Sequence, residues 1–550
     1  MRRNTVRAII LVMFLLFEPE AFPSGPQPPF AMIGWQIHER DVSKVAEAIQ
    51  RAPEYRINFL VFSHDLFRSV ENFLDSPEWQ KDLLHLGALA DEKKIPYYLW
   101  IHELDDIPKR FLVDKKRVNF DDPELFGFLA KRYERLLEVV PHVAGFVLTL
   151  REVDYLILRD SEVQSRLSYP DRICKLTRLI YGIAKKHNKQ LILRNFFYEP
   201  REMSCFADAI AKLPDDIIVM SKSTCHEFNP FYPADPMHGN VGKKRQIMEI
   251  DLGVEKALGP QGAYAQVEDI RRYVRRAKEK GLAGAVGRAR LIWDKPFEDS
   301  HEINLYAFSS FMANPDIPAD QVYDAWVKKH YPADAVPFII SALKRTEYIN
   351  HHGRYHLGFW LTKSLGVKWE KYSYYFGHIV LRSRYKWTQD PADKVLETKL
   401  LYPDMETYHQ LIAEKDEVIR QVRASLADLE KAAPYVPSET MKPLVQSFEF
   451  LLDGSYLARE WTCAFFAHRL YIQDPREEYR KMTEDALEQL EKLDKAPGIP
   501  YGLDPSASHR YHIADFVKTI RSRLQNPEAA IWEDNAILEK MSEKDSIDLE

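Results

Sequence analysis

The sequence predicts an α/β protein: a (β/α)8 barrel over residues 28–315, followed by an α-helical domain over residues 316–550. Eight short apolar runs recur along the first part of the chain, and amphipathic stretches separate most of them. Uninterrupted apolar strands that alternate with helices are typical of a parallel sheet covered on both faces. Eight such units fit a closed barrel. A doubly wound sheet is the alternative, but no glycine-rich phosphate fingerprint follows the first run.

Residues 1–24, which precede the barrel, are predicted to be a signal peptide. Three arginines stand before the apolar run 8–17, and that run is too short to span a bilayer as a helix. We therefore expect export to the periplasm or the outside of the cell, without stable membrane insertion. No small-residue cleavage pattern follows the run, so an uncleaved anchor stays open as an alternative.

The predicted strands follow one another at short intervals. In chain order they are residues 30–37, 57–64, 95–103, 143–152, 190–198, 216–224, 245–253 and 282–293. Between them lie helical stretches such as 267–281, whose charges follow a period of 3.6 residues and which ends at a glycine. Beyond residue 315 strand-like runs become scarce, and long helical stretches such as 406–433 take their place. Such helices also offer a surface for a homodimer.

Composition narrows the function classes. The net charge of the 550-residue chain is −6 and no basic stripe stands out, which argues against nucleic acid as a partner. The four cysteines show no paired spacing, so we expect buried thiols. The histidines show no metal-ligand spacing, and we expect neither a metal nor a cofactor.

Charged residues follow the apolar part of several predicted strands. The fourth strand, "GFVLTLREVDY" at 145–155, turns from apolar to charged within a few residues. The carboxyl ends of barrel strands converge on the active site. The side chains expected there are Trp35, Gln36, His64, His102, Glu103, Asp105, Glu152, Arg194, Lys222, Glu227, Glu249, Asp251 and Glu255. Any one carboxylate alone is explained by a surface loop or an ion pair, but the repetition at several strand ends indicates a site.

Several carboxylates in one cleft suit glycoside hydrolysis. One carboxylic acid protonates the leaving oxygen, while a second carboxylate activates water or attacks the anomeric carbon. The cations Arg194 and Lys222 suggest that the sugar or its substituent is anionic. An oligosaccharide or polysaccharide fragment is therefore the expected partner.

The residues quoted above resemble the family 67 glycoside hydrolases, the α-glucuronidases. The segments that carry the resemblance are "GFVLTLRE" at 145–152, "LRNFFY" at 193–198, "KSTCHEFN" at 222–229, "EIDLGVEKALG" at 249–259 and "NLYAFSSFMANPDIPADQVYDAW" at 304–326. The last segment is the most specific of the five. We expect this chain to lack the extra domain that precedes the barrel in that family, and a helical C-terminal domain is also expected from the resemblance.

The resemblance implies an exo-acting, inverting hydrolase that releases terminal glucuronic or 4-O-methylglucuronic acid from xylan fragments. Glu152 would be the general acid, and Glu227 and Glu255 would together activate the attacking water. Arg194 and Lys222 would bind the sugar carboxylate. The predicted substrate-binding set also contains Trp35, Glu249 and Trp293. Two alternatives stay open: a sugar-binding barrel without turnover, and a glycosidase of the same mechanism on a neutral or amino sugar.

Overall fold

The structure is a computed structural model of the chain. It describes residues 29–547 except 68, 254, 256, 259–260, 291–296, 298, 362–371 and 496–509. The predicted signal peptide and the strand-eight residue Trp293 therefore lie outside the described residues. Among the helices described, none is both long enough and apolar enough to cross a membrane.

Eight parallel strands form a closed barrel, which confirms the predicted fold class. The strands are β1 (Met32–His38), β2 (Phe59–Phe62), β3 (Tyr97–His102), β6 (Gly145–Thr149), β8 (Gln190–Asn195), β9 (Ile218–Lys222), β10 (Gln246–Asp251) and β11 (Gly284–Arg290). Seven of the predicted runs contain one strand each, and the run 30–37 covers all of β1 except His38. Around the barrel the order is β1-β11-β10-β9-β8-β6-β3-β2, and β1 pairs with β2 to close the circle.

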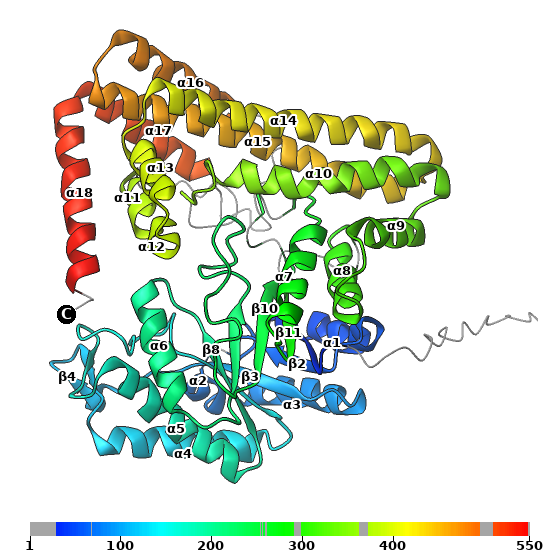
Figure 1. Ribbon diagram of the computed structural model, residues 1–550, viewed down its shortest axis with the longest axis vertical. Coiled ribbons are helices and arrows are strands. Elements are labelled where there is room, and N and C mark those ends of the chain that lie inside the picture. The colour runs from blue at the N-terminus through cyan, green and yellow to red at the C-terminus, as the bar shows by residue number, and fades with distance from the viewer. Residues whose placement is uncertain are drawn as a thin grey trace, which may run out of the picture.

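Helices cover the outside of the barrel (Figure 1). They are α1 (Val42–Arg51), α2 (Val70–Leu74), α3 (Pro77–Glu92), α4 (Pro123–Val139), α5 (Tyr169–Lys186), α6 (Pro200–Lys212), α7 (Val267–Glu279) and α8 (Glu302–Ala313). Several begin at an Asp or Ser whose side chain accepts a hydrogen bond from the first turn, as Asp122 does for α4 and Ser168 for α5. Such caps satisfy backbone N–H groups that have no partner within the helix.

The loops after β3 and β6 carry a small sheet that the sequence patterns did not indicate. Its strands are β4 (Leu112–Val113), β5 (Arg117–Asn119) and β7 (Val163–Gln164), in the order β4-β5-β7. The pairing ties the two loops together beside the carboxyl ends of their barrel strands.

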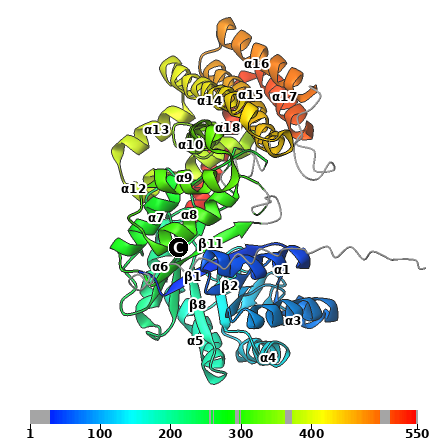
Figure 2. The same ribbon diagram turned by 90° about the vertical axis from the view of Figure 1, so that its right-hand side faces the viewer.

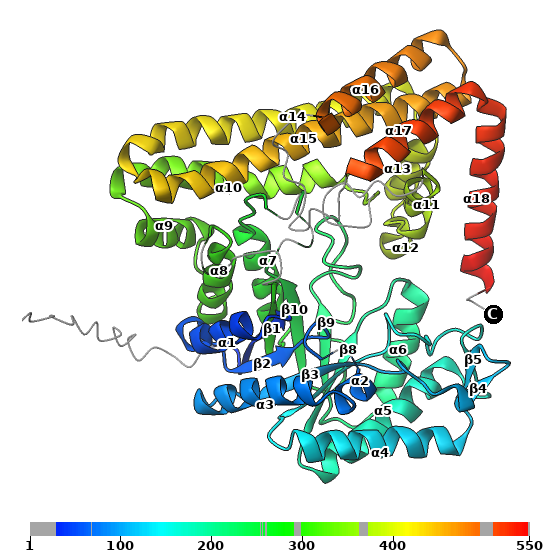
Figure 3. The same cartoon turned by 180° about the vertical axis from the view of Figure 1, so that it is seen from behind.

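Beyond the barrel the described chain is helical. The helices are α9 (Ala319–His330), α10 (Val336–Arg354), α11 (Tyr372–Leu381), α12 (Tyr385–Thr388), α13 (Pro391–Leu401), α14 (Met405–Ala432), α15 (Ser438–Gln473), α16 (Glu477–Lys495), α17 (Arg510–Gln525) and α18 (Pro527–Ile547). Helices α10, α14 and α15 form a layer over one end of the barrel (Figures 1 and 2). From that layer α18 descends towards the barrel (Figure 3).

Two large hydrophobic clusters show how the two regions are joined. One cluster combines the outer face of the barrel and its helices with residues of α10, α14 and the first part of α15, such as Ile339, Val422 and Phe448. The second lies within the helical region and contains Trp461, Phe465 and Leu487. The helical region thus has a core of its own and also shares the core of the barrel. The predicted boundary at residue 315 stays a prediction.

Candidate active site

Strand alternation decides which side chains lie inside the barrel. The inner cluster contains Val61, Trp100, Val147, Ile192, Met220 and Val286, and it fills the lower barrel with apolar groups. Two residues further along their strands, the same face carries Arg194, Lys222 and Arg288. We use the name barrel mouth for the inner residues at these strand ends together with two acids in the loops that follow: Gln36, His38, His102, Arg194, Lys222, Glu249, Arg288, Glu227 and Glu255. The switch from apolar to charged that the sequence showed therefore occurs along the inner face.

Glu249 and Arg194 form the central ion pair of the barrel mouth. Arg194 donates to both carboxylate oxygens of Glu249, with Nε–Oε2 at 2.8 Å and Nη2–Oε1 at 3.0 Å, and Gln36 donates to Oε1 at 3.2 Å. Burial alone would raise the pKa of Glu249, but the Arg194, Arg288 and Lys222 cations hold it below its usual value. Glu249 is therefore an ionised carboxylate that is fully enclosed by the protein.

Lys222 holds the carboxylate of Glu227. The Nζ–Oε2 distance is 2.9 Å, and Nζ lies 3.5 Å from the centroid of the Phe196 ring. Burial lowers the pKa of Lys222, and the charge of Glu227 opposes that effect. Both Arg194 and Lys222 are thus paired with protein carboxylates, so a role for them in binding a sugar carboxylate stays a prediction.

Arg288 connects the remaining acids of the barrel mouth. It forms an ion pair with Glu255, and its Nε lies 3.7 Å from Oε1 of Glu249. Burial lowers the pKa of Arg288, but Glu255, Asp251, Glu249 and Glu227 outweigh burial and raise it. Four carboxylates that come from two different strand ends therefore surround one guanidinium.

Glu152 lies at the rim, beyond the end of β6. Its side chain is exposed, and Oε1 accepts a hydrogen bond from the hydroxyl of Tyr198 at 3.1 Å. His102 Nδ1 lies 3.0 Å from the backbone carbonyl of Glu152. Burial raises the pKa of Tyr198, and the charges of Glu227 and Glu152 raise it further. Tyr198 is therefore close to two of the three carboxylates that were predicted to be catalytic.

The backbone is strained at two of these acids. Glu152 has φ 60°, Glu227 has φ 54° and Phe228 has φ 58°, in the left-handed region that favours glycine. Such a conformation costs about 1–3 kcal/mol for an ordinary residue, and proteins keep it where the surrounding structure enforces it, often at functional sites. The left-handed backbone at Glu152 and Glu227 sets the direction in which each side chain extends from the loop after its strand.

Three histidines surround Trp100 at the ends of β1, β2 and β3. Ring centroids of His38, His64 and His102 lie 5.3, 4.8 and 5.2 Å from that of Trp100. Burial lowers the pKa of His38 to about 3, with the Arg288 cation acting in the same direction, and burial lowers the pKa of His102 to about 4. These two imidazoles are therefore neutral at neutral pH.

Two groups of described residues bring three potential metal ligands together: His38, His64 and Asp65, and Asp269, Glu347 and His351. Protein partners already engage both groups. His38 Nδ1 lies 2.9 Å from Asp65 and its Nε2 lies 3.3 Å from Arg288, while Asp269 accepts from Arg272 at 2.6 Å. Each group is a hydrogen-bonded network next to an arginine, a poor environment for a cation.

Two of the predicted positions face away from the barrel mouth. The structure contradicts a sugar-binding role for Trp35, because this side chain points outward from β1, is fully buried, and packs 5.1 Å from Tyr55 between ring centroids. Its neighbour Gln36 faces the mouth instead. Glu103 also points outward, where Arg132 and Tyr133 of α4 bind its carboxylate. Glu103 is a structural residue.

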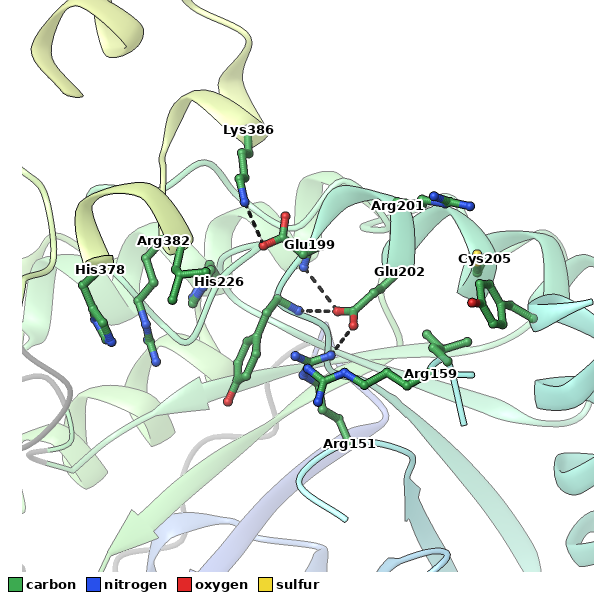
Figure 4. A pocket seen from close by; sticks show the side chains of 14 residues that line it. Arg151, Arg159, Glu199, Arg201, Glu202, Cys205, His226, His378, Arg382 and Lys386 are labelled. Atoms are coloured by element: carbon green, nitrogen blue, oxygen red, sulfur yellow. Dashed lines mark hydrogen bonds and ion pairs between the residues drawn. The ribbon is translucent and has the colours of Figure 1, made fainter. Parts of the chain in front are cut away.

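A cavity of about 400 Å³ adjoins Tyr198, between α6 and the α11–α12 segment (Figure 4). Most of its cations are paired: Arg151 with Glu202, Lys386 with Glu199 at 3.1 Å, and Arg159 with Glu162 at 2.9 Å. The guanidinium of Arg151 also lies 4.1 Å from the centroid of the Tyr198 ring. The barrel supplies one side of this cavity and the helical region supplies the other.

Sequence reasoning missed four residues of this site: Tyr198, His226, Arg288 and Arg382. Arg288 could have been found, since it shares the alternating inner positions of "GAVGRAR" with Val286. Arg382 could not, because its place beside Tyr198 depends on how the helical region packs.

Comparison with known proteins shows that this chain is similar to some of them in structure but not in sequence. No protein-family model and no curated protein matches the sequence. Among solved structures, a GH138 enzyme targeting pectin rhamnogalacturonan II shares 13% identity over 92% of this chain and 84% of that one, with a TM-score of 0.62. A mutant O-GlcNAc hydrolase from Thermobaculum terrenum shares 11% identity over 90% and 94%, with a TM-score of 0.44. The resemblance to family 67 is not shown by these comparisons. The chain shares its overall fold with that GH138 enzyme.

Proposed function

We propose that this protein is a glycoside hydrolase with its active site at the barrel mouth. The observation that carries the proposal is that Glu152, Glu227 and Glu255, which follow three different strands, are linked through two shared neighbours. Glu152 and Glu227 both raise the pKa of Tyr198, and Glu227 and Glu255 both raise the pKa of Arg288. Glycosidases need two carboxyl groups in different protonation states across one cleft. The fold shared with a GH138 enzyme supports the proposal.

The partners of each carboxylate suggest how the roles divide. Glu227 is paired with Lys222 and Glu255 with Arg288, and a cation at hydrogen-bonding distance favours the ionised form that a base requires. Among the described residues, no cation forms an ion pair with Glu152, whose carboxyl group contacts a neutral hydroxyl. Glu152 is thus our proposed general acid, and Glu227 and Glu255 together activate water for inversion at the anomeric carbon.

The proposed substrate is a polysaccharide fragment that ends in a uronic acid. Glucuronic or 4-O-methylglucuronic acid on xylan fragments is the first candidate, because the strand-end segments resemble the α-glucuronidases. Pectic fragments are the second candidate, favoured by the likeness over most of the chain to an enzyme targeting rhamnogalacturonan II. We also propose that the protein is exported from the cell and that it forms a homodimer through its long helices.

A direct test incubates the full chain with aldouronic xylo-oligosaccharides and, separately, with rhamnogalacturonan II fragments. Mass spectrometry should show the loss of one uronic acid from one of the two sets, and NMR of the fresh product should show an inverted anomeric carbon. If no fragment of either set loses a sugar, the chain is a sugar-binding protein and the hydrolase proposal fails.

Glu152→Gln keeps the shape of the side chain and removes the proton donor. Turnover of the oligosaccharide that reacts should fall about 10²-fold or more, while binding is retained. Glu138→Gln, an exposed change on α4, is the matched control and should leave the rate unchanged. Wild-type turnover by Glu152→Gln would remove Glu152 from the mechanism.

A further inference from the structure

We propose that Arg382, from the helical region, binds the carboxylate of the uronic acid. This inference rests on the proposed function and identifies the residue that would select an acidic sugar. It differs from the prediction from sequence, in which Arg194 and Lys222 had this role. The carboxylates of Glu249 and Glu227 already occupy those two cations.

Arg382 lies between α11 and α12, and its side chain points down towards the barrel beside His378 (Figure 4). The central carbon of its guanidinium lies 3.8 Å from the centroid of the Trp360 ring and 5.7 Å from that of the Tyr198 ring. Its Nη1 is buried without a hydrogen-bond partner, and no described carboxylate forms an ion pair with it. Aromatic rings hold the group in place and leave its donors available.

A second guanidinium group, that of Arg354, lies close to Arg382. Arg354 lies on the same Trp360 ring at 5.6 Å and donates to the backbone carbonyls of Glu255 and Ala257, at 2.6 and 3.1 Å, instead of to a carboxylate. Burial lowers the pKa of Arg354; Tyr355, Glu255 and Tyr264 oppose that effect, and the charge of Arg382 adds to it. Two neighbouring guanidinium groups without a carboxylate partner are costly in a partly buried place, and a bound anion would offset that cost.

A carboxylate fits this place better than a neutral group. Arginine donates two parallel hydrogen bonds to a carboxylate, and such charge-assisted bonds are about twice as strong as neutral ones. Of the other three cavity arginines, Arg151 and Arg159 are paired with Glu202 and Glu162, and Arg201 on α6 also has an interaction partner. Arg382 is thus the cavity guanidinium that the geometry assigns to a ligand.

The position also agrees with the proposed chemistry. Tyr198 contacts Arg382 with its ring and Glu152 with its hydroxyl, so it spans the interval between the two groups. His226 stacks on Tyr198 with centroids 5.3 Å apart and lies 6.2 Å from Trp360. A terminal uronic acid whose carboxylate is bound by Arg382 would therefore lie along Tyr198, with its glycosidic oxygen towards Glu152.

The test measures binding, so that it stays separate from turnover. Calorimetry compares D-glucuronate, D-galacturonate, D-glucose, D-galactose and glucose 6-sulfate on the wild type, Arg382→Met and Arg382→Lys. The wild type should bind at least one uronate about tenfold or more tightly than its neutral counterpart. Arg382→Met, which keeps the apolar stem on Trp360, should abolish that preference, and Arg382→Lys should keep part of it. Arg420→Met, on an exposed arginine of α14, is the control that should change nothing.

Several results would overturn the inference. They are equal binding of uronate and neutral sugar by the wild type, an unchanged preference in Arg382→Met, and tighter binding of the sulfate than of either uronate. The melting temperature of Arg382→Met should equal or exceed that of the wild type, since an unpaired charge is removed; a large drop would make Arg382 a structural residue. Uronate binding that depends on Arg382 without any hydrolysis would uphold this inference and refute the hydrolase.

Discussion

Positively charged side chains have different partners in the barrel mouth and in the helical region above it. In the mouth, Arg194, Lys222 and Arg288 each form an ion pair with a glutamate. On the helical side, Arg354 and Arg382 contact a tryptophan ring, and no described carboxylate pairs with either. Tyr198 lies within reach of both regions, because the charge of Glu227 raises its pKa and the charge of Arg382 lowers it.

This difference indicates that the cations of the two regions have different roles. Ion pairs in the mouth fix the orientation and ionisation of the carboxylates that would perform the chemistry, and preorganised groups of this kind cost no rearrangement during the reaction. Unpaired guanidinium groups on the helical side contribute less to folding and more to ligand binding. Substitutions in the two regions should therefore differ in whether they change stability or binding.

The largest effect is expected from Arg194→Met in the barrel mouth. It leaves Glu249, which is fully buried, without its bidentate partner. Removing one member of a buried pair costs about 3–5 kcal/mol. Denaturant unfolding should show that loss, whereas Arg382→Met should not lower the free energy of unfolding, because it removes a partly buried guanidinium that has no carboxylate partner.

A double variant separates the pair from general damage. Arg194→Met with Glu249→Met replaces both charges with apolar groups of similar volume, and such replacements are often neutral or stabilising. The double variant should therefore recover most of the lost stability. If it is as unstable as Arg194→Met, the loss comes from packing against Trp100 and Phe196.

The sequence predicted the barrel mouth better than the helical side, and the reason is local. Apolar runs locate the strands, and the residues after them must lie at one end of a barrel, so Glu152, Glu227 and Glu255 could be found together. The sequence pattern did not show which of the alternating residues on a strand face the inside of the barrel. Trp35 was predicted to bind the substrate, but it is its neighbour Gln36 that faces inward. Ion pairing and the approach of Arg382 to Tyr198 depend on contacts between distant segments, which no local pattern encodes.

A fall in pH should lower the free energy of unfolding, because the barrel mouth contains buried neutral histidines. The pKa of His38 is lowered to about 3 and that of His102 to about 4, mainly by burial, whereas an unfolded chain binds these protons near pH 6.5. Their stabilisation is therefore present above about pH 6.5 and is lost as the pH falls towards 4. The free energy of unfolding should drop by about 1 kcal/mol per pH unit for each histidine over that window.

His38→Gln tests this contribution. The variant should show a shallower decline in the free energy of unfolding between pH 6.5 and 4, because one buried imidazole is gone. Acidic groups such as Glu249 add a slope of their own, which the comparison with the wild type removes. His142→Gln, on a histidine whose side chain is 73% exposed, is the matched control and should leave the slope unchanged. An unaltered slope in His38→Gln would mean that His38 becomes protonated in the folded chain.

The smallest effect is expected at the ion pair that joins the two regions. Lys386 of α12 contacts Glu199 at the start of α6 at 3.1 Å, and their side chains are 23% and 28% exposed. Partly exposed pairs contribute about 0–1 kcal/mol, because water screens them and two long side chains lose freedom. Lys386→Met should therefore lower the free energy of unfolding by less than about 1 kcal/mol. The hydrophobic cluster that continues from the barrel into α10, α14 and α15 should hold the two regions together without this ion pair.

Scanning calorimetry at low and high salt tests whether the two regions unfold together. A single cooperative transition is expected in both the wild type and the variant, and a separate early transition in Lys386→Met would mean that charge, and not the shared core, joins the helical region to the barrel.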